Sequence, residues 1–288
     1  MMREATSDDI DLIEAHLAQF PATTMFLRGN LLAHGVGWSD HPHSTRYFIS
    51  TAPPHLQAVF GVTQGGYLLA EASKAPDLSF AEFADHVPAL AAHGMTGDAV
   101  SVERTLRALG LVDASFQMLT DEPLMQLDLV DLPEATMSLR RATEADRALL
   151  SDWFIGYELD SGIAANEAQV RKHLEQRIEF ALARDTTVRI GLDVQGAPCA
   201  MAALNSRVAD IVQVGGVFVP RHSRSQGLGR RVTAALLREA FQDGARKAVL
   251  FAASVCAERA YRAIGFETIG TYRIALFSVP EDVGGRLQ

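Results

Sequence analysis

Apolar and polar positions repeat along the chain with two periods, and this pattern predicts a mixture of helices and strands. In the first half, runs of β-branched and aromatic residues at 46–50, 58–62 and 67–72 predict three strands. The sequence Thr63-Gln64-Gly65-Gly66 between the last two is typical of a hairpin turn. An apolar helical period precedes these strands and begins shortly after Thr6.

The second half shows a longer series of periodic segments. Helices are expected at 144–156, near 166–183, at 228–243 and at 257–264, and strands at 187–194, 197–204, 210–219, 247–252 and across 267–279. Gly196 marks the first hairpin turn, and Asn205-Ser206-Arg207 marks the second. Hairpins followed by alternating strands and helices predict an α+β (α/β three-layer) fold, with a mixed, mostly antiparallel sheet flanked by helices.

The stretch between the last hairpin strand and the following helix has the composition of an anion site. Val217-Phe218-Val219-Pro220 leads into polar residues and then into Gly227-Leu228-Gly229, where the helix begins. The first N–H groups of a helix lack partners, the helix dipole adds positive charge, and glycine lets a phosphate approach the backbone. Four arginines surround the turn: Arg221, Arg224, Arg230 and Arg231. We therefore expect a phosphate-bearing ligand.

Two common phosphate-binding sequences do not fit this turn, since a P-loop ends in Gly-Lys-Ser/Thr and a Rossmann turn needs Gly-x-Gly-x-x-Gly. The run from Arg224 to Gly229 instead resembles Arg/Gln-x-x-Gly-x-Gly/Ala, the pyrophosphate-binding turn of the GNAT acyltransferases, which bind acetyl-coenzyme A. The run from Ser254 to Phe266 resembles their second signature, Asn-x-x-Ala-x-x-x-Tyr-x-x-x-Gly-Phe. It departs in one place, where Ser254 replaces Asn. The resemblance covers residues 137–279.

This resemblance implies acetyl-coenzyme A as the cofactor and assigns roles to the matching residues. Backbone groups of Val217 and Val219 would align the pantetheine and the thioester, and the amides of residues 226–230 would hold the pyrophosphate. Tyr261 is the expected general acid for the departing thiolate. The implied cofactor contacts are Val217, Phe218, Val219, Arg224, Ser225, Gln226, Gly227, Leu228, Gly229, Arg230, Ser254, Ala257 and Tyr261.

Several candidate residues have structural alternatives that the sequence leaves open. Tyr261 shares a helix face with Ala257 and Ile264, so it fits a core position as well. Glu158 and Asp160 are the candidates for the general base, against an alternative role as solvated loop carboxylates. Glu258 fits a helix residue better than a base, and Cys256 fits a small buried residue better than a nucleophile. His222 is either a phosphate contact or a lone histidine in a polar loop. The spacing of His34, His41 and His43 does not support a metal site.

Two pairs of similar segments, called echoes below, indicate that the chain holds two related units. The segment from Arg3 to Asp9 shares the pattern Arg-x-Ala-Thr-x-x-Asp with the segment from Arg140 to Asp146. The segment 100–111 also lines up with 255–266, with identical Val, Glu, Arg, Arg, Ala and Gly at equivalent places. Two echoes in the same order predict a tandem repeat.

Only the second unit carries both signatures. In the first unit the region that corresponds to the phosphate turn is expected at 80–93, a helical pattern that ends at Gly94. Leu106 stands where the second unit has Tyr261, and leucine can donate no proton. We therefore expect a degenerate GNAT-like domain at 1–132 and an acetyl-coenzyme A-binding GNAT domain at 137–288, with the boundary near residues 131–136.

Composition supports this division and narrows the class of protein. The 288 residues suit two domains of about 150 residues each. Two cysteines, an acidic N-terminus unlike a signal peptide, and no apolar run near ~20 residues favour a cytoplasmic protein without membrane attachment. Residues 1–135 carry 6 Lys/Arg against 18 Asp/Glu, which argues against nucleic acid as a partner and favours either solubility or a cationic substrate.

The function that follows is an acetyl-coenzyme A-dependent N-acetyltransferase, with a small-molecule amine or an exposed amino group as acceptor. The alternative is a coenzyme A-binding regulatory or scaffold protein without turnover, because Ser254 replaces Asn and no base is evident. Assembly as a homodimer stays open. The acceptor itself is not encoded in any shared motif.

Overall fold

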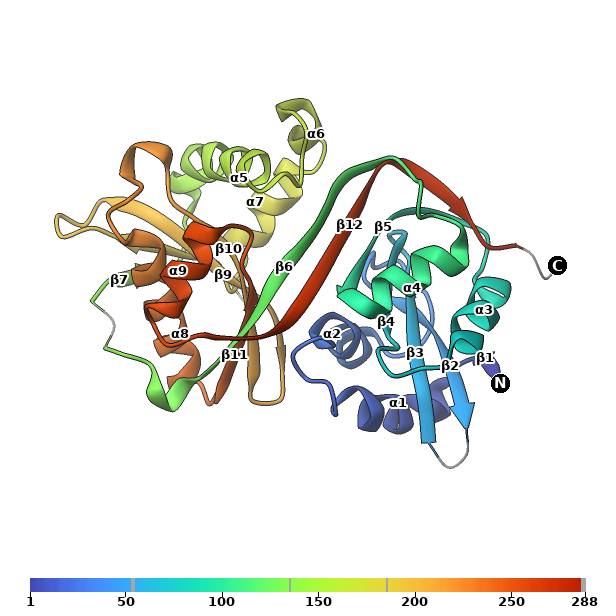
Figure 1. The fold of residues 1–288 in the computed structure, drawn as a ribbon. Helices are drawn as coiled ribbons and strands as arrows, with labels where there is room; N and C mark the ends of the chain where they lie inside the picture. Colours follow the sequence, from blue (N-terminus) through green and yellow to red (C-terminus); the bar gives the residue numbers. More distant parts are fainter. Residues whose placement is uncertain (53–54, 135, 185, 286–288) are drawn as a thin grey trace. The chain divides into compact units, whose positions relative to one another are not determined.

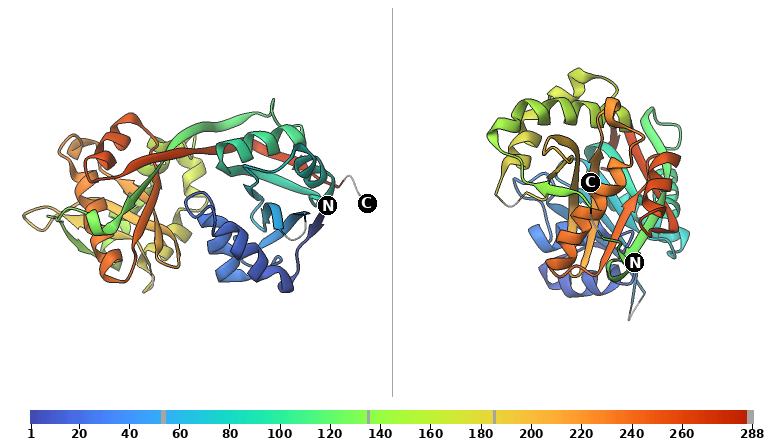
Figure 2. Two further views of the ribbon diagram at one scale, coloured as in Figure 1. Left: turned by 60° about the horizontal axis from the view of Figure 1, so that its bottom comes forward. Right: turned by 90° about the vertical axis from the view of Figure 1, so that its left-hand side faces the viewer.

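The computed structural model describes residues 1–52, 55–134, 136–184 and 186–285. The chain forms two compact units, residues 1–122 with 271–288 and residues 123–270. In each unit helices cover both faces of a sheet (Figure 1, Figure 2). Two strands cross the division along the chain, β6 (Phe116–Asp128) and β12 (Glu267–Val283).

The division differs from the predicted domains at both boundaries. Residues 123–132 lie in the second unit, because β6 pairs with β11 (Lys247–Phe251) from Leu124 to Asp128. The end of β12 lies in the first unit, because it pairs with β5 (Leu90–Asp98). A strand belongs to the sheet that it pairs with, and the proline-broken stretch 131–136 does not reveal that pairing. Residue 135 of that stretch and residues 286–288 lie outside the described residues.

The first unit has the strand order β1-β2-β3-β4-β5-β12. Its pairs are antiparallel except β4 with β5, which are parallel. Its further elements are β1 (Met2–Glu4), α1 (Ile10–Leu17), α2 (Met25–His34), β2 (Thr45–Ala52), β3 (His55–Thr63), β4 (Tyr67–Glu71), α3 (Asp77–His86) and α4 (Ala99–Leu109). The three strands expected at 46–50, 58–62 and 67–72 are confirmed.

The second unit has the strand order β6-β11-β10-β9-β8-β7. Here β10 and β11 form the parallel pair, and the other pairs are antiparallel. Its further elements are β7 (Ser138–Arg140), α5 (Arg147–Ser161), α6 (Glu167–Arg171), α7 (Leu174–Leu182), β8 (Arg189–Leu192), β9 (Pro198–Val208), β10 (Ile211–Phe218), α8 (Leu228–Gln242) and α9 (Val255–Arg262). The two units therefore repeat one mixed, mostly antiparallel plan, as the sequence predicted.

Side chains that alternate along the strands build a core on each face of each sheet. In β2, Tyr47 and Ile49 pack under α1 and α2, whereas Phe48 packs under α3 and α4. In β9, Ala200 faces α8 and α9, whereas Met201 faces α5, α6 and α7. Strands buried on both faces explain the continuous apolar runs from which they were predicted.

Two details of the second unit correct the sequence predictions. Asn205-Ser206-Arg207 lies within β9 and is not a turn, because β9 and β10 stay paired as far as Val208 and Ile211. The turn is Ala209-Asp210, where Ala209 adopts a φ of 51°. The helix expected near 166–183 is two helices, α6 and α7. Polar residues on an exposed hairpin resemble turn residues, which explains the first error.

The first sequence echo folds into the same capped helix start in both units. Arg3 forms two hydrogen bonds with Asp9, at 2.7 and 2.6 Å, and Arg140 forms two with Asp146, both 2.7 Å. Each aspartate also accepts a backbone N–H from the threonine three residues earlier, at 2.8 Å in both units. Such a capping box fixes where the helix begins, so the shared pattern encodes a shared local structure.

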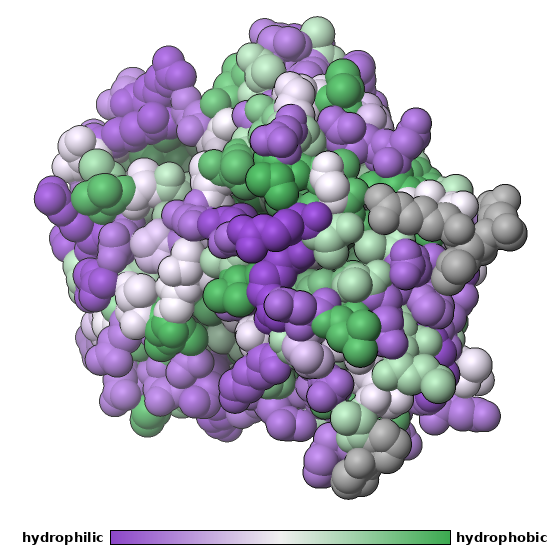
Figure 3. All heavy atoms as spheres, turned by 45° about the vertical axis from the view of Figure 1, so that its right-hand side comes forward, coloured by the Kyte–Doolittle hydropathy of each residue, from purple (hydrophilic) through white to green (hydrophobic). Residues whose placement is uncertain are grey.

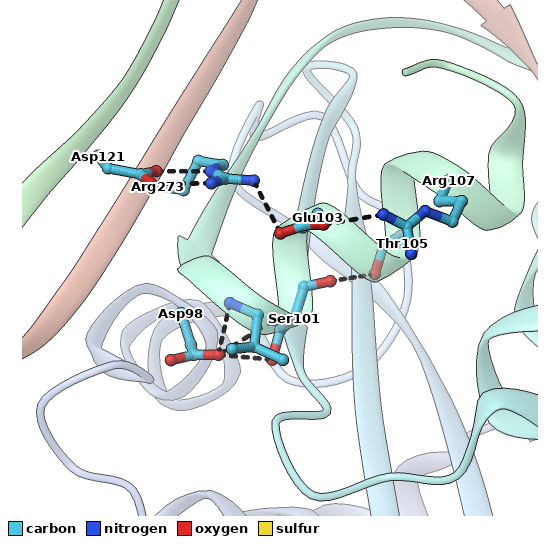
Figure 4. Close-up of polar contacts among 8 residues, drawn as sticks. Asp98, Ser101, Glu103, Thr105, Arg107, Asp121 and Arg273 are labelled. Atoms are coloured by element: carbon cyan, nitrogen blue, oxygen red, sulfur yellow. Dashed lines mark hydrogen bonds and ion pairs between the residues drawn. The ribbon is translucent and has the colours of Figure 1, made fainter.

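The second echo also folds alike, on α4 and α9. An ion pair joins Glu103 to Arg107 on α4 at 2.9 Å, and another joins Glu258 to Arg262 on α9 at 2.8 Å. Both helices are followed by a glycine of positive φ, 77° at Gly110 and 103° at Gly265. Figure 4 shows that Arg273 of β12 contacts both Glu103 and Asp121 in the first unit. The echoes therefore mark a structural repeat.

None of the helices in the described ranges has the length and apolar character needed to span a membrane. On the face that Figure 3 shows, hydrophilic residues are spread widely and hydrophobic ones lie between them.

The Arg140–Asp146 pair provides a test of what the capping box contributes. The hydrogen bonds from Arg140 lower the pKa of Asp146 to about 2. We expect Asp146→Asn to reduce the free energy of unfolding of the second unit by about 1 kcal/mol at pH 7. Because the folded pKa is depressed, this difference is present above the pKa of an unfolded aspartate, about 3.9, and disappears as the pH falls to about 2.

Urea unfolding followed by fluorescence measures this difference, in a Trp38→Phe background so that Trp153 of α5 reports alone. Asp152→Asn is the matched control, because Asp152 is exposed on the same helix. An equal loss of stability in both variants would contradict the prediction.

Candidate active site

The parallel pair of the second unit separates after three residue pairs. Ile211, Val212 and Gln213 of β10 pair with residues 247–249 of β11, and within the described part of the chain the pairing goes no further. On its other side β10 stays paired with β9 as far as Phe218 and Met201. The edge of β10 from Val214 onward therefore keeps N–H and C=O groups that an extended ligand can pair with.

Two glycines shape this edge. The β9–β10 register shifts between Gly215 and Phe218, and Gly216 adopts a φ of 59°, which a residue with a side chain rarely adopts. The Asn205 side chain lies over Gly215 and fills the space that a Cβ would need. A bulge of this kind turns backbone groups out of the ladder and is frequent next to binding sites.

The predicted phosphate turn follows directly. After Pro220, residues Arg221–Ser223 form one 3₁₀ turn, and α8 begins at Leu228 behind Gly227, whose φ is 72°. No side chain caps this helix start. Ser225 also has a positive φ, 64°, which is costly for a residue that carries a Cβ. The result is a helix N-terminus with uncapped N–H groups, as an anion site requires.

The four arginines of the turn divide into two pairs. Asp160, near the end of α5, forms ion pairs with Arg221, at 2.6 Å, and with Arg224. Among the residues that the structure describes, Arg230 and Arg231 form no ion pair. The Arg230 guanidinium lies beside Gly227, with Nε 3.0 Å from where a Cβ would stand. Positive charge thus remains next to the first turn of α8.

Partial burial by itself raises the pKa of the Asp160 carboxyl. The hydrogen bonds from Arg221 and Arg224 outweigh this effect and leave the pKa below its usual value. Asp160 is therefore ionised at neutral pH and has both oxygens engaged, which does not suit a general base.

Tyr261 lies in the apolar cluster that connects the turn with the strand edge. It is 8% exposed, and its ring centroid is 5.9 Å from that of Phe266. Leu228 belongs to the same cluster, and Val217, Val219 and Ala257 pack against it. Tyr261 thus shares one apolar cluster with residues of the strand edge and of the start of α8, and its role as the general acid stays a prediction.

Ser254 serves as the N-cap of α9, because its hydroxyl accepts the Ala257 N–H at 3.1 Å. Ser and Asn cap helices about equally well, so the departure from the Asn signature keeps the helix start. The hydroxyl is already engaged in this bond, which leaves less of it for a cofactor.

Glu158 is fully buried on α5, not solvated in a loop. Its oxygens contact His173 Nε2, at 3.0 and 3.1 Å, and the guanidinium of Arg177. Arg177 also lies over the Phe154 ring, 4.7 Å from its centroid. With both oxygens engaged and no exposed surface, Glu158 holds α5 and α7 together and does not face a substrate directly.

Comparison with known proteins agrees with this geometry. Residues 160–275 match the family described as the acetyltransferase (GNAT) domain. The part of the chain that matches, most of it in the second unit, is a GNAT domain. No curated protein sequence matches the chain.

Solved structures extend the likeness to the whole chain. A Drosophila protein matches with a TM-score of 0.59 at 14% identity, over 96% of this chain and 98% of that one. A GCN5-related N-acetyltransferase from Sphaerobacter thermophilus matches with a TM-score of 0.54 at 14% identity, over 100% and 98%. One from Kribbella flavida matches with a TM-score of 0.51 at 18% identity, over 91% and 96%. At such identities the likeness concerns the fold alone, and it extends over both units.

In the first, GNAT-like unit the parallel strands stay paired where those of the second unit separate. Its parallel strands pair over four residues, Tyr67–Ala70 with residues 94–97, and the Ser101 hydroxyl then accepts the Ala72 N–H at 3.1 Å. The counterpart of the phosphate turn is the loop 72–76 between β4 and α3. The predicted counterpart, 80–93, was wrong, because it spans α3 and the start of β5. This loop has five residues and is followed by Asp77 at the start of α3. It contains no glycine-rich motif from which its position could have been predicted.

The structure assigns none of the remaining candidates the contacts of a catalytic or metal-binding residue within its described part. Glu258 pairs with Arg262, His222 is exposed in the 3₁₀ turn, and Cys256 is exposed on α9, not buried as the structural alternative held. His34, His41 and His43 gather in the first unit, where rings of His34 and His41 stack at 4.1 Å. Within the described ranges no group of His, Cys, Asp or Glu could hold a metal ion.

Sequence reasoning missed two features of the GNAT site. Gly215-Gly216 inside a predicted strand was a signal for the bulge, since adjacent glycines weaken a strand. The pairing of Asp160 with Arg221 and Arg224 joins residues more than 60 positions apart and left no local signal.

The Asp160 pair can be tested by binding of an anion. We expect Asp160→Asn to bind inorganic pyrophosphate about threefold more tightly than the parent, because two guanidinium groups lose the carboxylate that neutralises them. Isothermal titration calorimetry measures the affinity, and Asp152→Asn on the same helix controls for net charge. Equal affinities of the two variants would show that Asp160 does not compete with the anion.

Proposed function

We propose that the chain is an acetyl-coenzyme A-dependent N-acetyltransferase, and that the second unit carries the reaction. The observation that supports it best is the unpaired edge of β10, which runs straight into the uncapped start of α8. Pantetheine carries amides that can pair with a strand edge, and the pyrophosphate matches a helix N-terminus with nearby arginines. The strand edge leads directly into the helix start, just as the pantetheine of the cofactor is joined to its pyrophosphate.

The reaction requires the amine nitrogen to attack the thioester carbonyl carbon. A C–N bond forms, the C–S bond breaks, the nitrogen loses a proton and the thiolate gains one. Backbone N–H groups at the β10 bulge are the proposed donors to the carbonyl oxygen as negative charge develops on it. Tyr261, in the cluster against Val217 and Val219, is the proposed donor of the proton to the thiolate.

No side chain is proposed as the general base. Glu158 and Asp160 both have their oxygens engaged by cationic or imidazole groups. The amine must therefore arrive neutral or lose its proton to water. The acceptor class stays a small-molecule amine or an exposed amino group, and a binder without turnover is the alternative that the following experiments separate.

Gly227→Asp tests the cofactor site. The variant puts a negative charge at the start of α8 and a Cβ at a φ of 72°, so binding of acetyl-coenzyme A should fall by more than about tenfold. Gly196→Asp is the matched control, because Gly196 has a φ of 83° with nothing within 4 Å of an added Cβ, in a hairpin turn of the same unit. Calorimetric titration decides: a parent that does not bind acetyl-coenzyme A refutes the cofactor and the enzyme together.

Tyr261→Phe tests the reaction. Loss of the proposed general acid should lower the rate of thiol release by about 10²-fold or more, with coenzyme A affinity within about twofold of the parent. The rate is followed with a thiol reagent over a panel of primary amines. Tyr67→Phe in the first unit is the control and should keep the parent rate. A parent that binds acetyl-coenzyme A but never releases thiol supports the non-catalytic alternative.

A further inference from the structure

The first unit contains a cavity that the transfer reaction does not use. Its volume is about 360 Å³, which suits a small molecule. It lies between α1, the start of β3 and the end of β4, so all of its walls belong to one unit. The lining residues that matter below are Leu12, His16, Phe20, Leu56, Glu71 and Lys74.

Glu71 gives this cavity its chemical character. The residue is 2% exposed, and its carboxylate accepts three hydrogen bonds from neutral donors: Thr23 Oγ1 at 3.1 Å, and the N–H and Oγ of Ser73 at 3.2 and 2.7 Å. Two of these reach Oε1 and one reaches Oε2, so Oε2 retains acceptor capacity. Within the described residues no ion pair joins Glu71 to a cationic side chain.

A buried carboxylate without a counter-ion is unfavourable, and buried charges are normally paired. Burial raises the pKa of the Glu71 carboxyl, and the nearby carboxylate of Asp98 acts in the same direction, against the hydrogen bonds from Ser73 and Thr23. A cation brought into the cavity would offset both the burial of the carboxylate and its repulsion by Asp98.

Phe20 supplies a second element of cation recognition. The Lys74 ammonium already lies over its ring, 5.2 Å from the centroid, which shows that a cation can occupy this face. Thr23 connects the two elements, because its hydroxyl donates to Glu71 and lies 3.3 Å from the Phe20 carbonyl oxygen. Lys74 is exposed and so can move aside for a ligand.

The other titratable groups at the cavity do not supply the missing charge. Burial lowers the pKa of His16, whose ring lies 5.6 Å from Phe20, so it is neutral at pH 7. His55 lines the cavity from an exposed position at the start of β3. The surplus of acidic residues in the first half of the sequence also favours attraction of a cation.

We propose that this cavity binds a small organic cation, a primary amine with a short apolar chain. The ammonium group contacts the free acceptor position of Glu71 and the face of Phe20, and it displaces Lys74 from that face. The chain of the amine lies against Leu12 and Leu56. This amine is a ligand and not an acceptor, because the parallel strands of the first unit stay paired where those of the second unit separate, and because Leu106 stands in place of a proton donor.

Butylamine is the probe, and butanol is its neutral counterpart of the same size. Saturation-transfer NMR on the full chain at pH 7.5 measures both affinities. We expect butylamine to bind at least about tenfold more tightly than butanol, and Glu71→Gln to weaken butylamine by about tenfold, since a charge-assisted hydrogen bond is lost. Lys74→Met should strengthen butylamine severalfold, because it removes the competing ammonium.

Asp113→Asn is the matched control, because it removes the same charge from an exposed loop of the same unit. Its butylamine affinity should equal that of the parent, which also separates the Glu71 site from any amine bound by the second unit. The proposal fails if butylamine does not bind, if butanol binds equally well, or if Glu71→Gln and Asp113→Asn behave alike.

Thermal stability gives a second readout, first without the probe and then with it. Because the folded pKa of Glu71 is raised, ionised Glu71 costs stability as the pH rises through that pKa, and the cost is absent below the unfolded pKa. Glu71→Gln should therefore raise the melting temperature at pH 7.5 and have little effect near pH 3.5. Butylamine should raise the melting temperature of the parent but not of Glu71→Gln. A variant less stable than the parent at pH 7.5 would contradict an uncompensated charge.

Discussion

The separation of β10 from β11 is the constraint on which the proposed activity depends. A parallel pair that continued past Gln213 would use the backbone groups that the proposed cofactor needs. The first unit shows this outcome, since its parallel pair runs on and a serine hydroxyl then satisfies the next N–H. One fold therefore gives an open edge or a closed sheet, according to how its central strands pair. The Gly215-Gly216 bulge is the local feature that accompanies the open form.

The electrostatics of the two units follow the same contrast. In the second unit, Arg230 and Arg231 form no ion pair with the described residues and lie beside an uncapped helix start. Asp160 on α5 forms ion pairs with the other two arginines of the turn. In the first unit the equivalent region carries Asp77 at the start of α3, paired with Arg104 at 2.6 Å. An acidic residue at that helix start satisfies the dipole and repels phosphate. The first unit instead holds a buried carboxylate, that of Glu71, at the wall of a cavity, which is why we expect a cation there.

Much of the fold was predictable because its signals are local. Capping boxes, hairpin turns and apolar periodicity act within a few residues, so the strands of the first unit and the helix α8 were predicted nearly to their ends. The echo between 100–111 and 255–266 reflected equivalent ion pairs and glycine stops on α4 and α9. The glycine-containing turn before α8 was predictable for the same reason, since its glycines and arginines lie close together in the sequence.

The sequence by itself determined the two-unit plan, the layered fold and the residues of the turn, because each follows from short-range chemistry. Tertiary structure alone decided which strands pair, and so that β6 and β12 cross the division between units. It also decided the partners of the charged groups: Asp160 with two distant arginines, Glu158 with His173 and Arg177, and Glu71 with neutral donors only. Whether a carboxylate acts as a general base, as a structural ion-pair partner or as a cation site depends on its neighbours in space, which local sequence does not specify.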